Sequence, residues 1–145
     1  MTRTGPPLVL TGHRGVGEVV EGEALVSSEG FSARYDLDRT TSRISRASHP
    51  LFGRSIAGKV LVCPVAKGGF ATSWALHDLR ARGLAPAALI FGWANPVMVQ
   101  GAVLAGLALM DQLTPDPVAT IATGDWVRVD PRAGRVEVWR RTASG

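Results

Sequence analysis

Two short apolar runs, residues 60–64 and 87–91, constrain the fold of this chain more than any other feature. Runs of this length without a charged or polar interruption are typical of strands that are buried on both faces. Residues 72–82 lie between them with apolar side chains at near-helical spacing, and Gly83 is placed to end that helix. The centre of the chain therefore predicts a helix that connects two buried strands.

The flanking segments add a second helix and further strands. Asn95 and Pro96 form a turn and a helix start, because proline suits the first turn of a helix. Further elements are expected at residues 19–25 (a half-buried strand), 97–105 (a short helix), 107–110 (a strand), and 126–130 with 135–139 (a terminal hairpin). This order predicts an α/β fold: a βαβαβ-like centre, a mixed sheet with packed helices, and a second β layer.

Length and charge limit the classes of function. The 145 residues fit one domain, which we place at residues 12–140, between a flexible lead-in at 1–11 and a tail at 141–145. Lysine and arginine (16) outnumber aspartate and glutamate (12), but no basic stripe with interleaved aromatic residues marks a nucleic-acid surface. We find neither a membrane span nor the apolar core of a signal peptide, so we expect a cytoplasmic protein.

Cys63 is the only cysteine, so the chain can form no internal disulfide, which suits a reducing compartment. A single thiol cannot hold an iron–sulfur cluster, because such a cluster needs several thiolates. The three histidines are scattered, with no cysteine or glutamate at ligand spacing. We therefore expect Cys63 to be a buried hydrophobic residue, and we expect this chain to bind no metal or cofactor itself.

The segment at residues 64–73 is the strongest candidate for a binding site. It combines a strand end, a glycine turn and a helix start, an arrangement that directs backbone N–H groups and the positive end of a helix at one anionic group. We predict Lys67, Gly68 and Gly69 as substrate-binding residues, because the lysine adds a point charge and the glycines let a ligand approach the backbone. The alternative interpretation is an ordinary strand-to-helix turn that is capped by a hydroxyl group.

Thr72 and Ser73 supply the hydroxyl groups of this turn, and either could act in catalysis only beside an activating neighbour. His77 follows Ser73 by one helical turn and Asp78 is adjacent, which leaves open a free-standing hydrolase. The alternative interpretation is a helix cap followed by a solvated helix face. Residues 35–39 mix acidic and basic side chains in a loop and predict a local ion-pair network.

An ordered set of short segments resembles a known family. The segments are 22–27 (GEALVS), 49–53 (HPLFG), 58–62 (GKVLV), 67–69 (KGG), 85–90 (APAALI), 95–96 (NP), 101–106 (GAVLAG) and 123–125 (TGD). Each segment is short, but their order over residues 12–138 is similar to that of the aconitase X swivel domain. The resemblance implies the swivelling β/β/α fold of the aconitase superfamily.

The resemblance also implies a reaction and a partner. The chain would be the small subunit of a hydro-lyase, a dehydratase, and a large subunit would carry an iron or iron–sulfur centre. That metal would bind the leaving hydroxyl of a small hydroxy acid while a base removes a proton from the neighbouring carbon. Family substrates are cis-3-hydroxy-L-proline in bacteria and mevalonate 5-phosphate in archaea. The Ala-, Arg- and Gly-rich composition favours the hydroxyproline-type substrate.

One segment departs from the family pattern. Many members carry Gly-Arg-Gly-Ser-Ser at the strand-to-helix turn, with the first serine as the base, whereas residues 67–71 of this chain are Lys-Gly-Gly-Phe-Ala. An ungapped alignment puts Phe70 at the base position, so the next hydroxyls, Thr72 and Ser73, become the candidate catalytic residues. The alternative function is a non-catalytic binding or regulatory module that has kept the fold.

Overall fold

The computed structural model describes residues 5–32, 36–67 and 70–141, except for the side chains of residues 70–73. The described part contains strands β1 (Leu8–Thr11), β2 (Val20–Val26), β3 (Leu37–Asp38), β4 (Arg43–Ile44), β5 (Val60–Val65), β6 (Ala88–Trp93), β7 (Ala108–Met110), β8 (Trp126–Asp130) and β9 (Arg135–Trp139), and helices α1 (Phe70–Ala81), α2 (Pro96–Ala105) and α3 (Pro117–Thr120).

Seven strands form one mixed sheet in the order β1-β9-β8-β2-β5-β6-β7, and β3 pairs with β4 as a separate small sheet. The β2, β5, β6 and β7 strands run parallel, whereas β1, β9, β8 and β2 pair antiparallel. The outer edge of β7 is covered by the segment that precedes β2, because Val16 and Leu109 exchange two backbone hydrogen bonds of 3.0 Å. The large sheet therefore closes on itself in the manner of a barrel.

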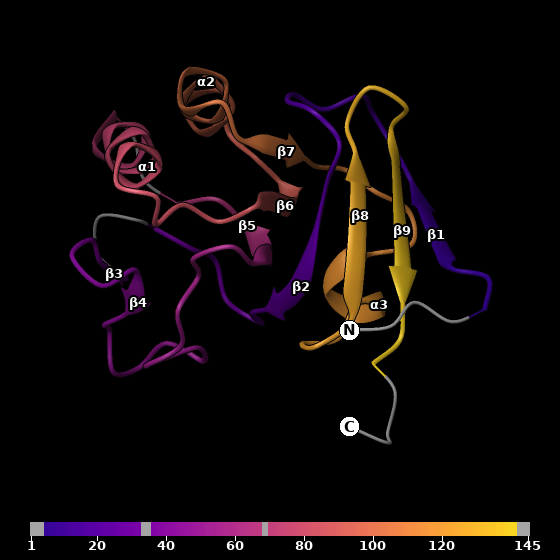
Figure 1. Ribbon diagram of the computed structural model, residues 1–145, viewed down its shortest axis with the longest axis horizontal. Coiled ribbons are helices and arrows are strands. Elements are labelled where there is room, and N and C mark those ends of the chain that lie inside the picture. Colours follow the sequence, from indigo (N-terminus) through magenta and orange to yellow (C-terminus); the bar gives the residue numbers. More distant parts are fainter. Residues whose placement is uncertain (1–4, 33–35, 68–69, 142–145) are drawn as a thin grey trace.

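The two buried strands divide the core between two layers. In β5, Val60 and Val62 pack with the apolar side chains of β6, β8 and β9, whereas Leu61 and Cys63 pack with α1 and α2. Figure 1 shows this arrangement, with α1 and α2 on one side of β5, β6 and β7, and with β8, β9 and α3 on the other. Alternate side chains of β5 thus face two different apolar layers, which explains why the sequence of this strand is apolar without interruption.

Several predicted elements are confirmed. The terminal hairpin forms between β8 and β9 over the predicted residues. Asn95 caps α2, since its side chain accepts a hydrogen bond of 2.8 Å from the Met98 N–H group, and Gly83 follows α1 with a positive φ of 74°. No helix among the described residues is long and apolar enough to cross a membrane.

Two predictions about element boundaries are wrong. Residues 8–11 belong to the predicted flexible lead-in but form β1, which pairs with β9 and places Leu10 in the core. The first helix starts at Phe70, so Thr72 and Ser73 lie inside α1 and not at its cap. Local propensity favours a hydroxyl residue at the cap, but the position of a helix start also depends on where the preceding strand ends.

Candidate functional site

Lys67 lies at the edge of the sheet where the parallel strands end and the two long helices begin. Strand β5 ends at Val65 and α1 begins at Phe70, and the same edge holds the end of β6 and the start of α2. Ligands of parallel α/β sheets, both open and closed, bind at this carboxyl edge. The side chain of Lys67 is exposed, whereas Gly68, Gly69 and the side chains of Thr72 and Ser73 lie outside the described part of the chain.

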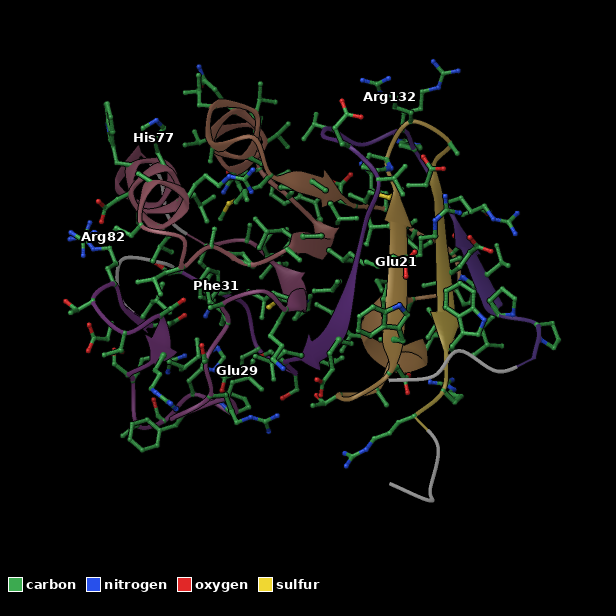
Figure 2. All side chains as sticks on the ribbon, viewed as in Figure 1. Glu21, Glu29, Phe31, His77, Arg82 and Arg132 are labelled. Atoms are coloured by element: carbon green, nitrogen blue, oxygen red, sulfur yellow. The ribbon has the colours of Figure 1, made fainter. Side chains whose placement is uncertain are left out.

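A segment after β2 continues beside β5 and anchors the backbone of Lys67. The Ser27 N–H group donates to the Val62 carbonyl at 2.8 Å, and the Phe31 N–H group donates to the Val65 carbonyl at 3.2 Å. The Lys67 N–H group then donates to the Phe31 carbonyl at 2.8 Å. Phe31 is fully buried, and Figure 2 shows it between the helices and the small sheet. The backbone of Lys67 is therefore anchored to the sheet, and its side chain extends from that fixed position.

The aliphatic part of the Lys67 side chain passes close to the backbone of Gly30. A Cβ atom at Gly30 would lie 2.8 Å from Cε of Lys67 and 2.7 Å from Cγ2 of Val65. Real Cβ atoms essentially never approach other atoms this closely, so a larger residue would displace the lysine or the valine. Glycine at this position leaves room for the close approach of these side chains, and its φ lies outside the positive region.

His49 locks the Gly30 backbone in place. Its ring is buried, Nδ1 accepts a hydrogen bond of 3.1 Å from the Leu51 N–H group, and Nε2 lies 3.2 Å from the Gly30 carbonyl. Because Nδ1 accepts, the hydrogen must be on Nε2, and the ring is the neutral tautomer. His49 is thus a buried loop histidine that joins two segments of the chain.

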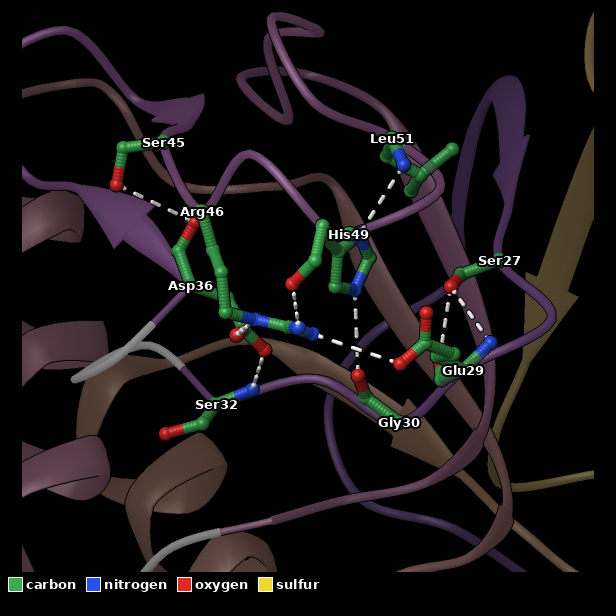
Figure 3. A network of polar contacts seen from close by, with 10 residues as sticks. Ser27, Glu29, Gly30, Ser32, Asp36, Ser45, Arg46, His49 and Leu51 are labelled. Atoms are coloured by element: carbon green, nitrogen blue, oxygen red, sulfur yellow. Dashed lines mark hydrogen bonds and ion pairs between the residues drawn. The ribbon is translucent and has the colours of Figure 1, made fainter.

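Asp36 and Arg46 form the centre of a polar network next to this segment (Figure 3). The buried carboxylate of Asp36 accepts hydrogen bonds from the Ser32 N–H group at 2.8 Å and from Nε of Arg46 at 2.5 Å. Arg46 also lies 3.6 Å from the Glu29 carboxylate. The hydrogen bond with Asp36 raises the pKa of Arg46, so this guanidinium stays charged.

The predicted ion-pair network at residues 35–39 is therefore only partly right. Asp36 belongs to a network, but its cationic partner is Arg46 and not the adjacent Arg39. Asp38 accepts a hydrogen bond of 2.9 Å from the Thr40 N–H group in its own turn. Sequence distance misleads here because the β3–β4 hairpin brings Arg46 back to Asp36.

His77 and Asp78 each interact with a different side chain. The His77 ring stands edge-on to the Trp74 ring at a centroid distance of 6.3 Å, and Asp78 pairs with Arg82 at 3.2 Å. Figure 2 shows His77 and Arg82 on the outer side of α1. A polar depression of 580 Å³ borders the C-terminal end of α1. It is lined by Leu37, Asp38, Arg39, Thr40, Asp78 and Arg82. These contacts give no support to a catalytic pair of His77 and Asp78.

The described residues offer no obvious metal ligand set. No group of three histidine, cysteine, aspartate or glutamate side chains within the described ranges could hold a metal ion. Cys63 is buried on the helix-facing side of β5. Burial raises the pKa of its thiol above the usual range, and the nearby Asp36 carboxylate adds to the rise.

The closed mixed sheet and the two long helices on one side of it are the architecture of a swivel-type α/β domain. The family model of the aconitase X swivel domain matches residues 9–138. This chain therefore belongs to the aconitase X swivel domain family, as the ordered segments of the sequence predicted.

The chain is similar to small subunits of phosphomevalonate dehydratases. The phosphomevalonate dehydratase small subunit of Methanocella arvoryzae is 37% identical over 129 residues, which cover 89% of this chain and 98% of that protein. The phosphomevalonate dehydratase small subunit of Methanopyrus kandleri is 38% identical over 123 residues, with 85% of this chain and 90% of that protein covered.

Two solved structures share the fold. A chain in the crystal structure of Thermococcus kodakaraensis aconitase X in its holo-form superposes with a TM-score of 0.85 at 34% identity, covering 92% of this chain and 99% of that chain. The solution NMR structure of a UPF0107 protein gives a TM-score of 0.82 at 30% identity, covering 92% of this chain and all of the other. The predicted α/β swivel fold is thus confirmed.

Proposed function

We propose that this chain is the small subunit of an aconitase-X-type dehydratase that removes water from mevalonate 5-phosphate. The observation that carries this proposal is the match to phosphomevalonate dehydratase small subunits along nearly their whole length. Composition favoured cis-3-hydroxy-L-proline as the substrate, but composition reflects the genome more than the site. The names of the relatives favour the phosphorylated substrate instead.

The subunit would contribute binding and orientation, and its large partner would carry the iron or iron–sulfur centre. That centre would supply Lewis-acid chemistry at the leaving hydroxyl. In this chain, the ammonium group of Lys67 would attract an anionic group of the substrate to the carboxyl edge of the sheet. The backbone pairing of Lys67 with Phe31 and the passage of its side chain beside Gly30 support this role, because both place the lysine at this edge.

The test is reconstitution with the large subunit. We expect the two chains, expressed together, to co-purify and to dehydrate mevalonate 5-phosphate, with little turnover of cis-3-hydroxy-L-proline. Loss of the substrate hydroxyl, followed by mass spectrometry of the product, is the measurement. Turnover of hydroxyproline alone would replace the proposed substrate, and a chain that never joins a large subunit would contradict the dehydratase role.

The two lysines of the chain provide a matched pair for testing the site. Lys59 lies at the opposite end of β5 and pairs with Glu23 at 3.1 Å. We expect Lys67→Ala to raise KM by about 10-fold or more, the effect of one lost charge-assisted hydrogen bond. Lys59→Ala should leave KM unchanged. Equal effects of the two variants would remove Lys67 from the binding site.

Phe70 gives a specific reason to keep a second candidate function, a non-catalytic binding module. The helix begins at Phe70, the position at which the family resemblance implies a serine base, and a phenyl ring can transfer no proton. Ser73→Ala and Thr72→Ala variants of the reconstituted complex separate the two functions. Loss of turnover with retained substrate binding would support a displaced base, whereas a wild-type complex that binds substrate without turnover would support the binding module.

A further inference from the structure

The hydroxyl group of Ser32 is buried and has no hydrogen-bond partner among the described residues. Only 3% of the residue is exposed. Its other polar groups are used: the N–H group donates to the Asp36 carboxylate at 2.8 Å, and the carbonyl accepts from the Asp36 N–H group at 2.9 Å. A buried hydroxyl without a partner is rare and destabilising, so its retention needs an explanation.

Ser32 lies beside Lys67 at the carboxyl edge of the parallel strands. It directly follows Phe31, whose backbone pairs with both neighbours of Ala66, so Ser32 runs beside Lys67 along two parallel segments. Side chains alternate along extended backbone, which predicts Ser32 on the same face as Gly30. That is the face crossed by the Lys67 stem. The twelve-residue helix α1 begins three residues after Lys67 and directs its positive end to this edge.

The surroundings of Ser32 are built to hold it still. The Asp36 carboxylate fixes its N–H group, Arg46 fixes that carboxylate, and His49 fixes the carbonyl of Gly30 two residues earlier. Figure 3 shows the Ser32 hydroxyl turned away from Asp36 and Arg46. The backbone is therefore held from both sides while the hydroxyl stays free to bond elsewhere, which is the arrangement expected of a preorganised ligand contact.

We propose that the Ser32 hydroxyl donates a hydrogen bond to an anionic oxygen of the substrate that Lys67 attracts. This inference rests on the proposed function, because it takes the phosphate or the carboxylate of mevalonate 5-phosphate as the source of that oxygen. A hydrogen bond to a charged oxygen is stronger than a neutral one and gains further strength in a buried setting. Ser32 then acts as a substrate-binding residue whose bond stays unmade in the free chain.

The test compares Ser32→Ala with Ser28→Ala in the reconstituted complex. Ser28 is an exposed serine of the preceding loop and serves as the matched control. We expect Ser32→Ala to raise KM for mevalonate 5-phosphate by about 10-fold or more, with a thermal midpoint equal to or above that of the wild type. Ser28→Ala should change neither value. A purely structural serine would instead lower the midpoint and leave KM unchanged.

Two further arms identify the oxygen and separate this inference from the proposed function. If Ser32→Ala weakens binding of inorganic phosphate to the complex, the contact is with the phosphate; if it weakens binding of mevalonate only, the contact is with the carboxylate. If the wild-type complex shows no turnover, ligand-induced thermal shifts of wild type and Ser32→Ala still decide. A shift lost in the variant supports the Ser32 contact although the dehydratase role fails, and equal shifts overturn the contact.

Discussion

At the scale of single residues, burial in the core changes the ionisation of Cys63. The thiol lies on the helix-facing side of β5, and burial raises its pKa above the usual range, with a smaller contribution from the Asp36 carboxylate. An unperturbed cysteine ionises at a pKa of about 8.5. The native thiol stays protonated there, and thiols without thiolate character react slowly with disulfide reagents.

This raised pKa predicts how stability depends on pH. Above about pH 8.5, Cys63 loses its proton in the unfolded chain and keeps it in the native protein, so the free energy of unfolding falls as pH rises. The contribution of this group is at most about 1.4 kcal/mol per pH unit. We expect Cys63→Ala, which cannot ionise, to show a shallower decline in urea unfolding between neutral and alkaline pH. Parallel declines in the two proteins would contradict a protonated native thiol.

Residues of the site differ in how far sequence could identify them. The position of Lys67 was predictable, because the strand before it and the helix after it follow one another in sequence and meet at one edge of the sheet, whereas its role in binding stays a prediction. Ser32, Asp36 and Arg46 were not, because their roles depend on segments that pair only in three dimensions. The one local signal was the mixed charge of residues 35–39, and the cation within that segment, Arg39, is not the partner of Asp36.

At the scale of elements, local patterns predicted the strands with a continuous apolar run or a regular alternation, and they missed β1, which has neither. Strands β5 and β6 are uninterrupted apolar runs, and β8 and β9 alternate across a short turn. Strand β1 buries only Leu10 among its four residues, so it has no periodic signal of its own. It forms because the hairpin offers it an edge to pair with.

The closure of the sheet depends on a glycine that the sequence did not single out. A Cβ atom at Gly15 would lie 2.1 Å from the Leu109 carbonyl oxygen, next to the two hydrogen bonds that join Val16 to Leu109. We expect Gly15→Ala to lower the free energy of unfolding by about 2–3 kcal/mol, because the backbone must move apart. Amide exchange of Val16 and Leu109 should accelerate more than that of the β8–β9 hairpin.

Gly53→Ala serves as the control for this prediction. Gly53 has a positive φ of 84° and open space where a Cβ atom would lie, so its substitution tests backbone conformation without a clash. We expect it to leave the exchange of Val16 and Leu109 unchanged, although it lowers stability by about 1–2 kcal/mol. Wild-type exchange at both amides in Gly15→Ala would show that the sheet closes without this glycine.

At the scale of the whole molecule, the four tryptophans are divided between the two layers of the domain. Trp74 is 71% exposed on α1 and Trp93 is 52% exposed at the end of β6, where it stands in register with Val65, two residues before Lys67. Trp126 and Trp139 lie on the hairpin of the other layer, where Trp126 donates to Glu21 at 2.7 Å. Large exposed aromatic side chains of this kind are enriched in protein interfaces.

If the dehydratase site forms between two subunits, the large subunit must cover the edge that holds Lys67. Single-tryptophan variants, with the other three changed to phenylalanine, then report where it binds. We expect the emission of Trp93 to shift to shorter wavelength and its acrylamide quenching to fall on addition of the large subunit, because contact removes water from the indole ring. The emission of Trp139 should stay constant, since β9 lies in the other layer and is separated from β5 by β8 and β2 in the sheet (Figure 1). A shift at Trp139 with none at Trp93 would place the partner on the hairpin side and would leave Lys67 outside the shared site.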